Sequence, residues 1–169
     1  MSTLTADPPF SRGHTLGEGV KVYPPEFGDR WVGVEKVFTD VHAVSGDFLS
    51  NMAVRCVALR NKSGAPLLPG QVVNHLVGEV DALAAAGDPL TAVVDEYIPA
   101  SGVKEEDVFW AVINGPTSAV CAAAAKGDTL GVGAGDAVAG TGLGVAIADA
   151  VDGKVRLVVG VAQLSASNG

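Results

Sequence analysis

The last 48 residues of the chain lack most of the side chains that catalysis uses. From residue 122 to residue 169 there is no His, Cys, Glu, Met, Pro or aromatic residue. Short aliphatic runs remain, separated by pairs such as Gly127-Asp128, Gly135-Asp136 and Asp152-Gly153. Because Gly and Asp tolerate the positive φ of tight turns, this pattern predicts short β-strands joined by turns. We therefore expect this region to serve structure or attachment rather than acid–base or nucleophilic chemistry.

Charged residues are also scarce, and their balance is acidic. They make up 18% of the chain, against roughly 25% in an average soluble protein, and the net charge is −8. A nucleic-acid-binding face needs clustered basic residues, and Arg55, Arg60 and Lys62 are the nearest approach to one. We expect no nucleic-acid partner. Because apolar residues make up 48% of the chain and monomers seldom leave large apolar patches bare, a homo-oligomer or assembly subunit is expected.

Neither a long hydrophobic segment nor the pattern of an export signal is expected from the residues of this sequence. The longest apolar run, Ala119–Ala125, is far shorter than the roughly 20 residues of a membrane-spanning helix, so no membrane association is expected. The N-terminus has no basic stretch followed by a hydrophobic one, so no signal peptide is expected. Cys56 and Cys121 have apolar neighbours and no CxxC spacing. They are expected to be buried thiols, and the sequence leaves a disulfide between them open.

The first 30 residues differ from the rest of the chain. They contain four of the nine prolines, as Pro8-Pro9 and Pro24-Pro25, and show neither helical nor strand periodicity. Proline fixes φ and lowers the entropy lost on docking. Residues 1–30 are therefore predicted to be an extended arm, and residues 31–169 a single β-rich body.

The body is predicted to be mainly β, a compact β-barrel or β-sandwich-like unit with one or two short helices. Strands are expected within Trp31–Phe38, Asn51–Leu59 and Val108–Ile113, the last of them ended by an Asn-Gly-Pro break. The segment Val77–Ala86 is the best helix candidate, because its apolar residues recur at helical spacing before a Gly-Asp-Pro stop. Residues 118–125 fit either a helix or a strand.

No cluster of residues suggests a metal or a cofactor. The three histidines, His14, His42 and His75, have no second His or Cys at metal-ligand spacing, so neither a metal nor a cofactor is expected. The glycine runs at 131–135 and 140–144 lack the spacing of nucleotide-binding loops and are expected to be β-turns.

Catalytic residues are not expected either. Asp95 and Glu96 are adjacent, and adjacent residues on a strand point to opposite faces, so they form no acid–base pair unless the backbone turns. A hydrolase using either carboxylate with His75 would require these side chains to converge in a cleft. Trp31 and Trp110 are expected to pack in the core, whereas a glycan-binding site would require one of them to be exposed.

The order of four further segments carries a resemblance to a known family. The segments are Val37–Asp40, Val54–Gly70, Val94–Val103 and Asp107–Pro116, followed by the tail with its Gly-Asp turns. Together they resemble the capsid decoration, or cement, proteins encoded in the head-gene region of tailed bacteriophages. The similarity covers roughly residues 37–160, and its motifs are structural rather than catalytic.

The resemblance implies a non-enzymatic virion protein, made in the host cytoplasm and located on the outer surface of an icosahedral capsid. Its partner would be the major capsid protein, whose neighbouring subunits it would bridge as a homotrimer, frequently with an N-terminal arm on the shell. The capsid-binding residues expected on this basis are those of the arm: Pro8, Pro9, Phe10, Tyr23, Pro24 and Pro25. The alternative is a glycan- or host-surface-binding module displayed on the virion.

Overall fold

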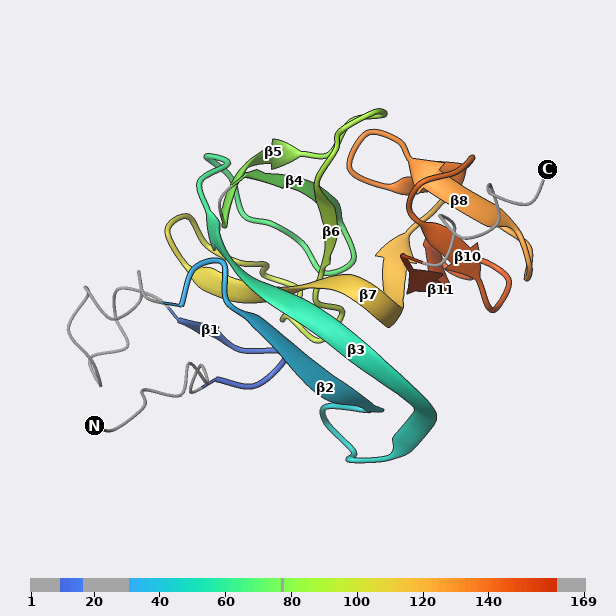
Figure 1. Ribbon diagram of the computed structural model, residues 1–169, viewed down its shortest axis with the longest axis horizontal. Helices are drawn as coiled ribbons and strands as arrows, with labels where there is room; N and C mark the ends of the chain where they lie inside the picture. Colours follow the sequence, from blue (N-terminus) through green and yellow to red (C-terminus); the bar gives the residue numbers. More distant parts are fainter. Residues whose placement is uncertain (1–9, 17–30, 77, 161–169) are drawn as a thin grey trace.

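The computed structural model describes residues 10–16, 31–76 and 78–160 of the 169-residue chain. These residues form eleven strands and no helix (Figure 1), which confirms the prediction of a mainly β protein. The strands are β1 (Thr15–Leu16), β2 (Glu35–Val41), β3 (Phe48–Asn61), β4 (Val72–Leu76), β5 (Glu79–Leu83), β6 (Thr91–Val94), β7 (Val108–Val120), β8 (Thr129–Val132), β9 (Ala137–Ala139), β10 (Gly144–Ala146) and β11 (Lys154–Val159).

The strands belong to one mixed sheet with the order β2-β3-β5-β4-β6-β7-β11-β10-β8-β9, and β1 pairs with β7. Because β3 also pairs with β7, strands β3, β5, β4, β6 and β7 pair in turn and are termed the ring. Strands β8–β11 lie to one side of it and are termed the lobe (Figure 1). The sheet continues beyond the ring to β2 at one end and to β9 at the other, so it is not one closed barrel and the barrel alternative is wrong.

Strand β7 connects the ring to the lobe. Its first half pairs with β3 and β6, and its second half, from Gly115 to Val120, pairs with β11. At Gly115 φ is +101°, and an added Cβ would meet the carbonyl oxygen of Ala53. The predicted break at residues 114–116 is therefore wrong, because a glycine there lets one strand change partners without ending.

The ring separates two hydrophobic cores. Val57, Leu59 and Phe109 belong to one core together with residues of β4, β5 and β6. Neighbouring residues such as Cys56 and Trp110 point the other way, into a second core shared with the lobe. Because the first part of β7 is buried on both faces, residues 108–113 form a continuous apolar run rather than an alternating one.

The helix predicted at Val77–Ala86 is wrong. Residues Glu79–Leu83 form β5, which pairs with β4 and with the end of β3. Gly78, just before it, has φ of +83°, and an added Cβ there would lie 2.8 Å from the amide nitrogen of Gly33. Pairing on both sides of β5 thus overrides the helical spacing of its apolar residues.

The tail has the structure that its turn pattern predicts. Strands β8–β11 are each three to six residues long. The glycine runs at 131–135 and 140–144 lie at the connections from β8 to β9 and from β9 to β10. Cys56 and Cys121 are both buried and free. Burial raises the pKa of the Cys56 thiol to about 12, so this residue is an inert part of the core.

Candidate functional site

The described part of the N-terminal arm packs against the chain's own body. The phenyl group of Phe10 stacks on the indole of Trp110, with centroids 4.7 Å apart. The indole Nε1 of Trp110 donates a hydrogen bond of 3.0 Å to the Phe10 carbonyl. Phe10 is buried in the core, and β1 pairs with Val108 and Phe109 of β7. The other predicted capsid-binding residues, Pro8, Pro9, Tyr23, Pro24 and Pro25, lie outside the described residues.

A buried ion pair fixes this segment. The Nη2 of Arg12 lies 3.0 Å from Oδ1 of Asp95, whose side chain has no exposed surface. The amide of Gly13 donates to the other carboxylate oxygen at 2.7 Å. Burial raises the pKa of the Asp95 carboxyl, and Arg12 and the amide of Gly13 oppose that shift. A partner-less carboxylate at this depth would be costly, so Arg12 is required wherever Asp95 is charged.

A second arginine continues the same network toward the β2–β3 hairpin. Arg156 of β11 donates to Glu96 at 2.8 Å and to Asp40 at 3.0 Å. Asp40 also accepts a hydrogen bond of 2.6 Å from Ser50 Oγ. Burial acts to lower the pKa of Arg156, but Glu96 and Asp40 outweigh it and the net shift is upward. The network therefore ties the lobe to the base of the hairpin.

The structure does not bring His75 to the carboxylates that a hydrolase would need. Val72 of β4 lies opposite Val93 of β6, so Asp95 falls opposite residue 70. That is five residues from His75, or roughly 16 Å at about 3.3 Å per residue. Asp95 and Glu96 are instead held by arginines. The carboxylates of Asp95 and Glu96 thus neutralise arginines of the same chain.

The other residues that the sequence suggested for a metal or glycan site are His42, Trp31 and Trp110. His42 Nδ1 accepts a hydrogen bond of 3.1 Å from the amide of Ser45, and no group of His, Cys, Asp and Glu within the described ranges could hold a metal ion. Trp110 is fully buried, which confirms its predicted place in the core, and Trp31 is half-buried. A glycan platform on Trp110 is therefore ruled out.

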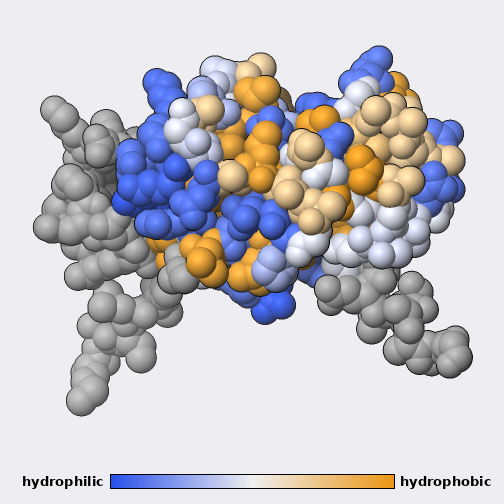
Figure 2. All heavy atoms as spheres, turned by 90° about the horizontal axis from the view of Figure 1, so that it is seen from above, coloured by the Kyte–Doolittle hydropathy of each residue, from blue (hydrophilic) through white to orange (hydrophobic). Residues whose placement is uncertain are grey.

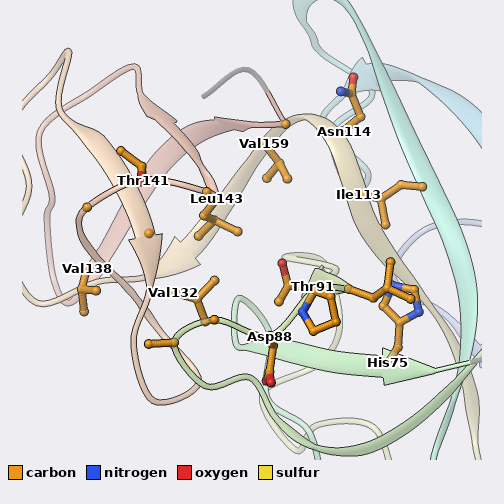
Figure 3. Close-up of a pocket in the computed structure, with 18 of the residues that line it drawn as sticks. His75, Asp88, Thr91, Ile113, Asn114, Val132, Val138, Thr141, Leu143 and Val159 are labelled. Carbon is orange, nitrogen blue, oxygen red and sulfur yellow. The ribbon is translucent and has the colours of Figure 1, made fainter. Parts of the chain in front are cut away.

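A groove of about 720 Å³ lies between the ring and the lobe. Figure 3 shows Val132, Leu143 and Val159 on its lobe side and His75 on its ring side. Burial lowers the pKa of His75 and so favours its neutral imidazole. The wall mixes aliphatic and polar groups without a cluster of like charges. Sequence patterns could not indicate this groove, because its two walls come from separate parts of the chain.

The exposed apolar side chains at the end of the β2–β3 hairpin form the strongest candidate interaction surface. Residues 42–53, termed the hairpin tip, include Val44, Phe48, Leu49 and Met52, with exposed fractions of 87%, 62%, 45% and 43%. Val37 on β2 is 61% exposed. Figure 1 shows that this hairpin projects away from the ring and the lobe. The sequence suggested a strand here, but it gave no sign that the strand would leave the body.

Apolar residues are exposed on another face as well. Figure 2 shows them gathered across the middle of the face seen from above, with hydrophilic residues around them and the largest hydrophilic group toward one end. Leu76 and Leu90 are among the large apolar residues that remain exposed, at 64% and 47%. Among the described residues there is no helix long and apolar enough to cross a membrane.

No protein-family model and no curated protein matches this chain. The chain is similar to the solved structure of the N base of head fiber gp8.5 in bacteriophage phi29, with 20% sequence identity and a TM-score of 0.43. The similar region covers 62% of this chain and 92% of that chain. The similarity assigns no role to individual residues.

Proposed function

We propose that the protein is a structural component of a bacteriophage virion that binds the outer surface of an icosahedral capsid. In that position it bridges neighbouring subunits of the major capsid protein as a homotrimer and stabilises the shell. The observation that carries the proposal is the exposed, apolar hairpin tip, which is typical of a subunit in a larger assembly, on a body whose buried carboxylate Asp95 is already paired with Arg12. Such a surface suits lasting contact between the subunits of an assembly rather than turnover of a small substrate.

Stabilisation would follow from mass action. A protein that binds only the assembled lattice shifts the equilibrium toward that lattice by an amount set by its concentration and affinity. Many copies on one shell, each touching more than one subunit, add avidity to individually weak contacts. The proposal therefore does not require any single contact to be strong.

The arm remains the proposed shell contact, with a division of labour along its length. Phe10 and Arg12 are engaged within the chain, so they would anchor the arm to the body. Pro8, Pro9, Tyr23, Pro24 and Pro25 are the residues left for the shell. Their prolines would lower the entropy lost when the arm is ordered on a surface.

The first test is to count this protein against the major capsid protein in purified virions by quantitative mass spectrometry. We expect comparable copy numbers, with selective loss of this protein after mild stripping that leaves the shell intact. Absence of the protein from virions would overturn the proposed function.

A truncation then tests the arm. Deleting residues 2–9 removes Pro8 and Pro9 but keeps Phe10, so capsid binding should weaken while the melting temperature of the free protein stays unchanged. The matched control is Phe10→Ala in the full chain. It should lower the free energy of unfolding by about 3–5 kcal/mol, as for other buried aromatic residues. Capsid saturation by the truncated protein at the same concentration as the full chain would contradict the shell contact at Pro8 and Pro9.

A further inference from the structure

The hairpin tip differs from the rest of the surface in its charge. Between Val41 and Val54 there is no Lys, Arg or Glu, and the ionisable residues are His42 and Asp47. Ser45 Oγ donates to the Asp47 carboxylate at 2.7 Å. The whole chain carries a net charge of −8. Two copies of this protein therefore repel each other over most orientations, and the tip is a place where they can approach with little repulsion.

The exposed apolar area of the hairpin is large enough to matter for association. A Phe side chain buries roughly 150–250 Å², so Phe48, at 62% exposure, offers on the order of 100 Å². Val37, Val44, Leu49 and Met52 are exposed as well. Because neighbours on a strand such as Phe48 and Leu49 point to opposite faces, the two faces of the hairpin together offer on the order of 500 Å². Each partner in a standard protein interface buries about 800 Å². A partner that contacts both faces of the hairpin thus meets a large part of one such interface.

The base of the hairpin is held in place before any partner arrives. Asp40 on β2 binds both Ser50 on β3 and Arg156 in the lobe. At the turn, the amide of His42 donates to the carbonyl of Asp47, and the amide of Gly46 donates to the carbonyl of His42, both at 2.8 Å. A surface that is already ordered loses less entropy on binding.

From these three observations we propose that the hairpin tip of one copy packs against a second copy of this chain. The contact is made by Val44, Phe48, Leu49 and Met52, with Val37 beside them. The proposed function supplies only the number of copies, three, and the inference rests on it in that respect alone. The hairpin therefore forms the contact between copies, while the arm remains the proposed contact with the shell.

The test is sedimentation velocity on the purified full chain over a range of micromolar concentrations. The hairpin variant combines Val44→Asp with Phe48→Ser. The control combines Val151→Asp with Leu76→Ser, at residues that are 66% and 64% exposed and lie outside the hairpin. Both variants add one negative charge and remove two exposed apolar side chains. We expect the wild type and the control to associate, and the dissociation constant of the hairpin variant to rise about tenfold or more.

A wild-type chain that stays monomeric throughout would overturn the inference. So would equal weakening in the hairpin variant and the control, because that result would reflect added charge rather than a particular surface. Equal melting temperatures for the two variants exclude unfolding as the cause. Since sedimentation uses no capsid, self-association and virion incorporation fail or succeed independently.

Discussion

The two halves of strand β3 have similar apolar character and opposite surroundings. The outer half, Phe48–Ala53, exposes Phe48, Leu49 and Met52, whereas in the inner half Val54, Ala58 and Leu59 have no exposed surface. The inner half pairs with β2 on one edge and β7 on the other, whereas no residue of the outer half is paired with β7 in the sheet. Hydrophobicity along one strand therefore indicates that a segment will be covered, but not whether this chain or another molecule covers it.

The largest expected effect comes from breaking the buried ion pair that fixes the arm on the body. Arg12→Met leaves Asp95 without its guanidinium partner and should lower the free energy of unfolding by about 3–5 kcal/mol at neutral pH. Because the folded pKa of Asp95 lies above its unfolded value, its contribution to stability is greatest below about pH 3.9 and declines as pH rises through the folded pKa. Losing Arg12 raises that pKa further, so the decline should extend to higher pH. Urea unfolding from pH 4 to pH 8 measures both effects.

Two control variants test whether the loss of stability comes from leaving a charge buried without its partner, rather than from removing any charge. Arg55→Met removes a guanidinium whose partner Glu35 lies 2.9 Å away, in a pair that is about half exposed, so almost no change is expected. The double variant Arg12→Met with Asp95→Leu should recover most of the lost stability, since no unpaired charge stays buried. Equal losses in Arg12→Met and Arg55→Met would show that the arm is not held by the buried pair.

A matched pair of leucines compares the two halves of β3 directly. Leu59→Ala creates a cavity in the inner half and should lower the free energy of unfolding by about 2–5 kcal/mol. Leu49→Ala, at 45% exposure in the outer half, should change it by less than about 0.5 kcal/mol. Chemical denaturation of dilute, monomeric protein measures both values. A large loss for Leu49→Ala under these conditions would mean that the tip is part of the chain's own core.

The sequence predicted a mainly β protein, the turn-rich tail and the burial of Trp110, because each depends on local patterns, and its one or two short helices were wrong. It did not predict the partners of Asp95 and Glu96, because Arg12 and Arg156 lie 83 and 60 residues away from them in the chain. It misassigned β5 as a helix, because the decisive contacts, with the end of β3 and with Gly33, are also distant in sequence. Local patterns thus indicated the β class and the turns of the tail, whereas long-range pairing decided the state of β5, the continuity of β7 and which side chains came together.

The boundary between the two halves of β3 offers the smallest and most local test. Gly115 has φ of +101°, and a Cβ there would meet the carbonyl oxygen of Ala53 on β3. Gly115→Ala should therefore lower the free energy of unfolding by about 2–3 kcal/mol, through backbone strain and the displacement of β3 from β7. Gly127→Ala has a similar φ of +95° but open space around it, so it should cost only the strain, about 1 kcal/mol. Urea unfolding of both variants measures these losses. Equal losses in the free energy of unfolding would show that the backbone of β3 moves at Ala53 without cost. In that case the hairpin would not be held rigidly at its base.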